Sequence, residues 1–224
     1  MKIKYILLIV LASIAVTQAQ VRDARKIASG PTQPVVNEDR GRACIVVGST
    51  LPGRQSDTSI FEPQQYSIFL GKGWAADSLR AREPALSNLI PNASDTIEFD
   101  YLERFGWKSL YSANNYEEKL IDAGEGGVVS DLQIQSVLSG IIKDNPAAKP
   151  GDDTVYVIYL EPALTSTLGP IVGGKHYFAY HNAFNRSDMR LRYVVVPYEE
   201  NLRTAKRSAL IGFISAVFQP DCRP

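Results

Sequence analysis

The sequence predicts an α/β fold: a single layered domain in which a mixed β-sheet is flanked by helices. Residues 154–160 and 191–198 are rich in Val and Tyr, as buried strands are. Residues 130–143 and 201–218 have helical composition and lie on both sides of these strands in sequence, so we expect helices to cover the sheet. A chain of 224 residues is also long enough to bury one core without help from a metal or a disulfide, and it shows no internal repeat.

The first half of the chain holds the weaker signals. Residues 44–47 and 66–70 are apolar runs closed by glycine, and both are predicted strands. Residues 75–90 have helical composition, although Pro84 should end or kink a helix there. Residues 97–111 carry aromatic residues at mixed spacing and receive no assignment.

The clearest predicted helix spans residues 130–143. Ser130 and Gln133 have the spacing of a capping box, and Asp131 suits the positive end of the helix dipole. Pro146 follows the end of the helix. Its apolar residues form one stripe: Leu132, Val137, Leu138, Ile141 and Ile142.

The last third of the chain alternates strands with a helix. After a polar break, residues 154–160, 176–180 and 191–198 are the three strand candidates. A final helix is predicted over residues 201–218, where Pro220 stops it.

The chain begins with a pattern typical of a cleavable secretory signal peptide. Lys2 and Lys4 give a positive start, residues 6–16 are apolar, and Thr17-Gln18-Ala19 places small residues where a signal peptidase reads them. Cleavage after Ala19 would leave Gln20 as the new N-terminus. The apolar run is well short of the about 20 residues that a spanning helix needs, so a membrane anchor is the weaker alternative.

These signals divide the chain into three parts. Residues 1–19 are the predicted signal peptide, residues 20–41 a polar and flexible leader, and residues 42–224 a single α/β domain. We therefore expect a secreted or periplasmic protein without a transmembrane anchor.

Charge argues against nucleic acid as a partner. The chain has 24 basic and 24 acidic residues. Loss of Lys2 and Lys4 with the signal peptide leaves the mature chain slightly acidic, with no basic excess to hold a phosphate backbone.

Cys44 and Cys222 are the only cysteines. In an oxidising compartment such a pair forms a disulfide more often than not. The bridge would close nearly the whole domain, which stabilises a fold by about 4–5 kcal/mol in the chain-entropy description. The alternative is two separate thiols, because sequence alone does not show that the sulfurs meet.

The usual catalytic signatures do not occur in the sequence, which has no G-x-S-x-G, Walker loop or H-E-x-x-H. His176 and His181 are the only histidines, so a three-histidine zinc site is excluded. Two histidines with one carboxylate, from Asp152, Asp153 or Glu161, would still suffice for a metal. On a continuous strand, however, residues five apart face opposite sides. We therefore expect no metal and no other cofactor.

Five short segments follow one another in an order known from one family. They are residues 69–74 (FLGKGW), 130–135 (SDLQIQ), 154–162 (TVYVIYLEP), 178–184 (FAYHNAF) and 192–198 (RYVVVPY). They resemble the YLGxGW, TDAQIQ, TLYVVYxxP, FxGYHxAF and YAVxPY segments of secreted bacterial proteins related to plant exordium, the phosphate-induced proteins. The resemblance runs from about residue 69 to the end of the chain.

The resemblance also implies a metal-binding helix, whose key residues are different in this chain. The family carries a SHELAEAVTDP helix near the C-terminus, whose H-E-x-x-E pattern would place metal-binding groups one helical turn apart. Counted back from Pro220, Ile211 stands at the histidine, Gly212 at the first glutamate and Ser215 at the second. None of the three can hold a metal or act as a general base. Residues 201–224 contain no histidine or glutamate, so this conclusion does not depend on the register.

The altered helix predicts a secreted, non-catalytic, pseudoenzyme-like protein that binds an extracellular ligand or a component of the cell envelope. Tyr180 and His181, in the turn shared with the family, are the candidate binding residues. One alternative is a secreted metal-dependent hydrolase or peptidase that uses His181 with an acid from elsewhere. Another is a degenerate gene product that keeps only the fold.

Overall fold

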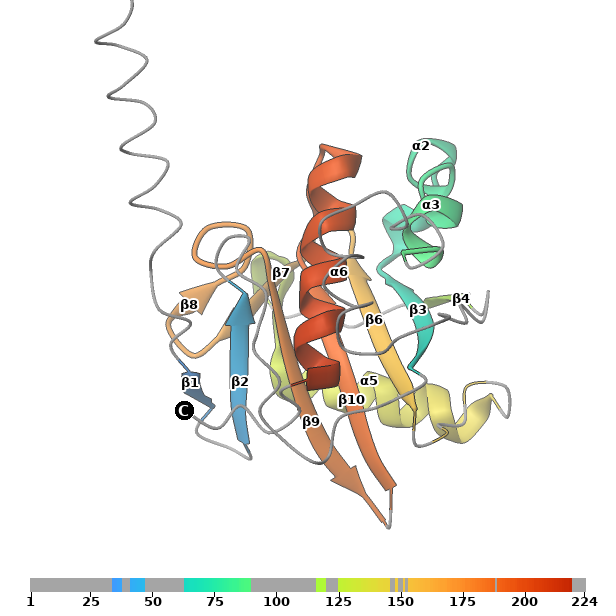
Figure 1. Cartoon of the computed structure of the whole chain (residues 1–224). Coiled ribbons are helices and arrows are strands. Elements are labelled where there is room, and N and C mark those ends of the chain that lie inside the picture. The colour runs from blue at the N-terminus through green and yellow to red at the C-terminus, as the bar shows by residue number, and fades with distance from the viewer. Residues whose placement is uncertain are drawn as a thin grey trace, which may run out of the picture. The chain divides into compact units, whose positions relative to one another are not determined.

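The computed structural model describes residues 34–37, 41–46, 63–89, 116–119, 125–145, 148, 151, 153–187 and 189–218. All of them belong to the compact unit Thr32–Pro224. Within these residues, seven strands form a mixed sheet in the order β1-β2-β9-β10-β6-β3-β4, and three more form a small sheet in the order β5-β7-β8. Helices pack on the large sheet (Figure 1), so the predicted α/β fold is confirmed.

The elements have the following bounds. The large sheet consists of β1 (Pro34–Asn37), β2 (Gly41–Val46), β3 (Gln64–Leu70), β4 (Tyr116–Lys119), β6 (Thr154–Leu160), β9 (Ala179–Arg186) and β10 (Met189–Val196). The small sheet consists of β5 (Val128–Ser130), β7 (Thr165–Leu168) and β8 (Ile171–Val172). The helices are η1 (Lys72–Ala75), α2 (Asp77–Arg80), α3 (Glu83–Ser87), η2 (Glu125–Gly127), α5 (Asp131–Asp144) and α6 (Leu202–Phe218).

Four neighbouring strands, β4, β3, β6 and β10, run parallel, whereas β9, β2 and β1 continue the sheet with antiparallel pairings. From β3 the chain passes to β4 on one side, and the next parallel strand, β6, lies on the other side of β3. The direction of the connections therefore reverses between β3 and β6. In open α/β sheets, the crevice outside the carboxyl ends of two such strands is the usual place for a ligand.

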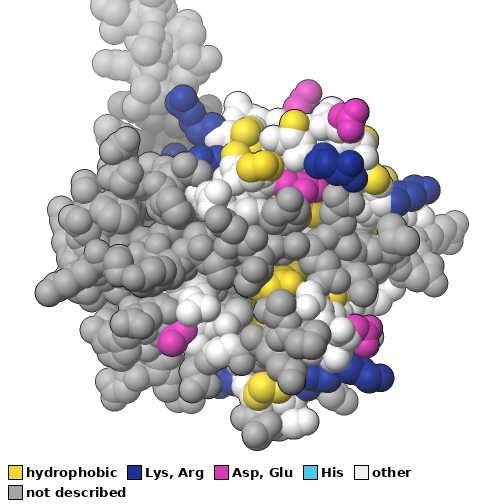
Figure 2. Space-filling view, turned by 90° about the vertical axis from the view of Figure 1, so that its right-hand side faces the viewer, with side chains coloured by type: hydrophobic (Ala, Val, Ile, Leu, Met, Phe, Trp, Pro, Cys, Tyr) yellow, Lys and Arg dark blue, Asp and Glu magenta, His cyan; other side chains and the backbone are white. Residues whose placement is uncertain are grey.

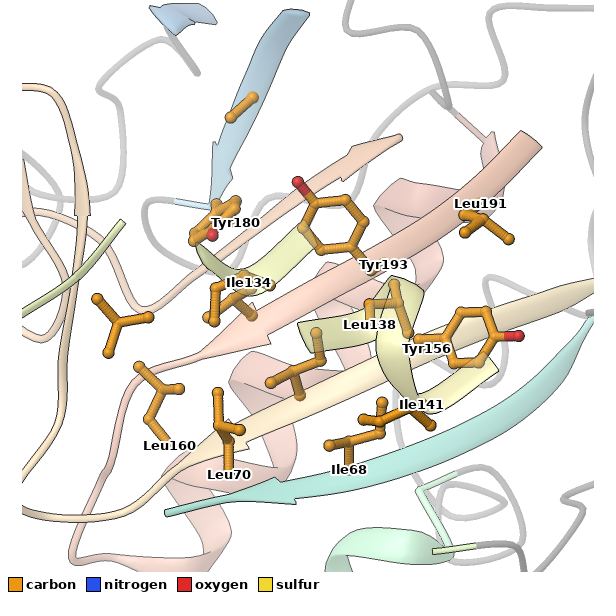
Figure 3. Close-up of a cluster of buried hydrophobic side chains, with 14 of the residues drawn as sticks. Ile68, Leu70, Ile134, Leu138, Ile141, Tyr156, Leu160, Tyr180, Leu191 and Tyr193 are labelled. Carbon is orange, nitrogen blue, oxygen red and sulfur yellow. The ribbon is translucent and has the colours of Figure 1, made fainter. Parts of the chain in front are cut away.

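Each face of the sheet has its own core. Because side chains alternate along a strand, Val157 and Tyr159 of β6 face α6, while Tyr156 and Ile158 face α5. On the α5 face, Ile134, Leu138 and Ile141 of the helix pack against side chains of the sheet (Figure 3). Of the predicted stripe, Leu138, Ile141 and Ile142 are buried as expected, whereas Leu132 is 39% exposed and Ile134, which was not part of the stripe, is buried.

The predicted cap of α5 is present. The Ser130 backbone N–H donates to Gln133 Oε1 at 2.8 Å, and the Gln133 N–H donates to Ser130 Oγ at 3.4 Å. The final helix also agrees with its prediction.

Three predicted segments differ from the structure. Residues 176–180 are not one strand, because the His176 N–H closes a turn on the Val172 carbonyl and β9 begins only at Ala179. The helix predicted over residues 75–90 is replaced, among the described residues, by the short helices α2 and α3. Pro84 lies in the first turn of α3, where its missing N–H leaves no helical bond unmade. Residues 34–37, expected in the flexible leader, pair with β2 as strand β1.

No helix among the described residues is long and apolar enough to span a bilayer. Seen from the side of β4, α2 and α3, basic, acidic and apolar side chains are interspersed over the described surface (Figure 2). This view gives no sign of a single-charge patch among the described atoms.

Candidate functional site

The carboxyl ends of β3, β6 and β10 lie next to one another, because these strands are parallel neighbours. Lys72 follows β3, Glu161 follows β6 and Tyr198 follows β10. Phe178 precedes the antiparallel strand β9, so it lies at the same edge, and its side chain is 44% exposed. We call these four residues the carboxyl edge.

Glu161 is the buried acid of the carboxyl edge. Its Oε2 accepts a hydrogen bond from the Gly73 backbone N–H at 2.5 Å, and its own N–H donates to the Leu70 carbonyl at 3.1 Å. A Cβ atom at Gly71 would lie 2.5 Å from the Glu161 side chain, and Gly71 has a φ of +119° that favours glycine. The glycine turn after β3 is therefore shaped around this carboxylate, which holds the turn in place.

Arg82 holds the part of the carboxyl edge that follows β10. Arg82 donates from Nη1 to the Tyr198 hydroxyl at 2.9 Å and from Nη2 to the Glu199 carbonyl at 2.6 Å. The guanidinium carbon also lies 5.1 Å from the centre of the Tyr198 ring. The segment after β10 is thereby tied to the start of α3.

A buried polar cluster lies around the Asp131 carboxylate, on the face of the sheet that α5 covers. Oδ1 accepts hydrogen bonds from the hydroxyls of Tyr180 at 2.8 Å and Tyr193 at 2.7 Å. Oδ2 accepts from Gln135 Nε2 at 2.9 Å and from Asn182 Nδ2 at 3.1 Å. We call these five residues the Asp131 cluster. Four donors from α5, β9 and β10 converge on one carboxylate at the start of a helix, where the dipole also favours a negative charge.

The tyrosines of the Asp131 cluster remain protonated at any physiological pH. Burial, followed by the nearby negative charge of Asp131, raises the pKa of Tyr180 and that of Tyr193 well above the ordinary value. Both phenols therefore act as hydrogen-bond donors.

The two candidate binding residues, Tyr180 and His181, point to opposite faces of β9. Tyr180 belongs to the Asp131 cluster, whereas His181 is buried on the α6 side, with 1% of its surface exposed. Burial lowers the pKa of His181 from 6.5 to about 3, so the imidazole is neutral. In the sheet register His181 stands opposite Cys44 of β2 and Val194 of β10. The structure thus does not bring the two residues together into one site.

His176 is exposed and lies in the turn before β9. Its Nδ1 accepts a hydrogen bond from the Val172 N–H at 2.9 Å, which closes the turn. Among the described residues, no three His, Cys, Asp or Glu side chains come close enough together to hold a metal ion.

The three positions that align with the metal helix of the resembled family lie in the core of the α6 face. Ile211, Gly212 and Ser215 are all buried. A Cβ atom at Gly212 would lie 2.6 Å from Val194 Cγ1 and 3.3 Å from Ala179 Cβ, so the backbone of α6 touches the sheet here. A glutamate in this position would have no room, and its charge would be desolvated.

Three expected features lie outside the described residues. Cys222 and the predicted signal peptide are not described, so the Cys44–Cys222 disulfide and the cleavage after Ala19 stay predictions. Asp152, offered with Asp153 and Glu161 as an acid for a metal, is also not described.

No protein-family model, curated protein or solved structure matches this chain. The resemblance to the exordium-like proteins rests on the five short segments alone.

Sequence reasoning missed the Asp131 cluster and the Glu161 contact. Asp131 looked like an ordinary helix-cap residue, and its partners Tyr180 and Tyr193 are 49 and 62 residues away. One sequence signal for the Glu161 contact was available. Glu161 comes directly after one buried strand, and the glycine turn at Gly71 and Gly73 comes directly after another.

Proposed function

We propose that this chain is a secreted, non-catalytic protein of exordium-like type that binds an extracellular ligand or a component of the cell envelope. The observation that carries the proposal is the packing of α6. The helix that would bear metal ligands in the resembled family has Gly212 against Val194, and Ile211 and Ser215 buried, so its role here is to support the sheet.

The hydrolase alternative depends on His181. A catalytic zinc needs about three protein ligands and an open position for water. His181 lies within the core of the α6 face, and its neutral imidazole is enclosed between neighbouring strands. These contacts favour a structural role for His181, and we do not pursue the alternative.

The carboxyl edge supports the binding role. It lies where the strand connections reverse, and it presents the exposed Lys72 and Phe178 on a frame held by Glu161 and Arg82. A rigid frame binds a ligand without a further ordering cost.

Zinc analysis tests the non-catalytic part of the proposal. Purified wild-type protein and His181→Ala protein, each incubated with zinc and dialysed, should both contain far less than one zinc per chain. His181→Ala should lower stability without any change in metal content, because it removes a buried side chain. One zinc per chain in the wild type that is lost in the variant would sink the proposal in favour of the hydrolase.

Co-sedimentation with insoluble envelope polysaccharide tests the binding part. We expect the wild type to sediment with the polymer and Phe178→Ser protein to sediment less. Leu132→Ser serves as the matched control, since Leu132 is similarly exposed, at 39%, but lies on α5 and is not one of the four residues of the carboxyl edge. Equal loss in both variants, or no binding by the wild type, would count against this ligand class.

A further inference from the structure

Two tyrosine hydroxyls share one buried carboxylate oxygen in the Asp131 cluster, an arrangement that a packed core does not require. Tyr180 and Tyr193 are fully buried, and Asp131 is 2% exposed. The other buried tyrosines with described acceptors differ. Tyr156 and Tyr159 donate to the neutral backbone carbonyls of Ala148 and Leu86.

We propose that Tyr180, Tyr193 and Asp131 form a proton-coupled redox site that gives up one electron to radical-type, one-electron oxidants. In this step the oxidant takes one electron from a phenol ring, and the O–H bond of that tyrosine breaks. The proton moves along the existing hydrogen bond to Asp131 Oδ1, where a new O–H bond forms. The products are a neutral phenoxyl radical, a neutral carboxyl group and the reduced oxidant.

The charge balance favours this site over other tyrosines of the core. Because the proton stays on Asp131, the step leaves no new positive charge in the core, whereas oxidation of a tyrosine bonded to a carbonyl would leave a buried cation. A phenol radical cation is a strong acid and must lose its proton at once. Tyr159 has only the Leu86 carbonyl as acceptor, at 2.9 Å, and a carbonyl cannot keep that proton. General-base help of this kind requires hydrogen-bond contact, which Asp131 has with both phenols.

Neighbouring rings give the electron a path through the protein. The ring centres of Tyr180 and Tyr193 are 6.4 Å apart. Tyr177 lies 5.6 Å from Tyr180, and the half-buried Phe184 lies 5.9 Å from Tyr193. Of these four rings only that of Phe184 is partly exposed, so it marks the side from which an oxidant at the surface takes the electron without reaching Asp131 itself.

Flash oxidation of the full chain tests the proposal. A photogenerated ruthenium(III) tris-bipyridine complex is used as the oxidant, and the samples are frozen for electron paramagnetic resonance. The wild type should give a tyrosyl signal with the resolved splittings of buried rings that are held in fixed orientations. The signal should persist in Tyr159→Phe protein. This variant is the matched control, because the hydroxyl that it removes donates to a carbonyl instead of a carboxylate.

The variants of the cluster separate the proposal from a purely structural role. Asp131→Asn keeps the shape of the side chain but removes the base, so the radical yield should fall to that of exposed tyrosines. Tyr180→Phe and Tyr193→Phe should each keep a radical on the remaining ring, and the double variant should lose the signal of the cluster. An undiminished signal in Asp131→Asn protein or in the double variant, or loss of the signal in Tyr159→Phe protein, would overturn the proposal.

Discussion

Gly212 decides how closely α6 lies on the sheet. The resembled family would have a glutamate at this position, but here the absent side chain lets the helix backbone meet Val194 and Ala179. Interiors are packed as densely as organic crystals, so even one methyl group needs space that this contact does not offer. Gly212 therefore offers no metal-binding group and at the same time permits the close packing of α6 on the sheet.

Gly212→Ala should lower the free energy of unfolding by about 1–3 kcal/mol, because the new methyl group overpacks the contact with Val194. Urea unfolding measures the effect. Gly140→Ala in α5 is the control, since a Cβ atom there meets nothing within 4 Å. That variant should gain about 0.5–1 kcal/mol from helix propensity. Equal stability of the Gly212 variant and the wild type would contradict the described packing.

His181 couples stability to pH. Its pKa is about 3 in the folded chain and 6.5 when unfolded, so below about pH 6.5 the unfolded chain binds one more proton. The stability that His181 supplies is complete above pH 6.5, and it decreases by about 1.4 kcal/mol per pH unit as the pH falls toward 3. His181→Gln protein, followed by urea unfolding between pH 7 and pH 4, should lack this part of the slope. The same pH slope in variant and wild type would show that His181 is not buried in its neutral form.

At the scale of elements, α5 illustrates how local signals and tertiary contacts share residues. Ser130 and Gln133 form the capping box. Asp131, the residue after Ser130, accepts hydrogen bonds from side chains of β9 and β10. The same turn thus starts the helix and fixes it to the sheet.

Ser130→Ala should cost about 0.5–2 kcal/mol, because the first turn of α5 loses its side-chain acceptor. Hydrogen exchange of the α5 amides should accelerate together with the drop in urea stability. Ser136→Ala, at an exposed position in the middle of the same helix, should leave both unchanged or slightly improved. A destabilisation of the same size in both variants would mean that the cap contributes nothing.

At the scale of the whole molecule, two predictions concern the exported protein: the cleavage of the signal peptide and the disulfide bridge. We expect mature protein that begins at Gln20 and has Cys44 joined to Cys222. Intact mass of exported protein, alkylated before and after reduction, should show the mass of residues 20–224 with no alkylated thiol at first and two afterwards. Retention of residues 1–19 contradicts the signal peptide, whereas two free thiols in fresh material contradict the bridge.

The sequence alone determined the helices α5 and α6 and four of the ten described strands, β2, β3, β6 and β10. The capping box, the apolar stripe of α5 and the Val- and Tyr-rich runs at β6 and β10 are local signals, and each is readable within a few residues. The strand predicted over residues 176–180 was wrong because a backbone turn at His176 interrupts this apolar segment. The alternation of apolar residues does not distinguish such a turn from a strand.

Only the tertiary structure decided which side chains meet. Glu161 contacts Gly73 across 88 residues because β3 and β6 happen to be parallel neighbours. Asp131 meets Tyr180 and Tyr193 because β9 and β10 lie beneath the start of α5. Local patterns specify the conformation of a segment, but strand order depends on the packing of the whole chain. For that reason the candidate site could not be derived from residues that are near one another in sequence.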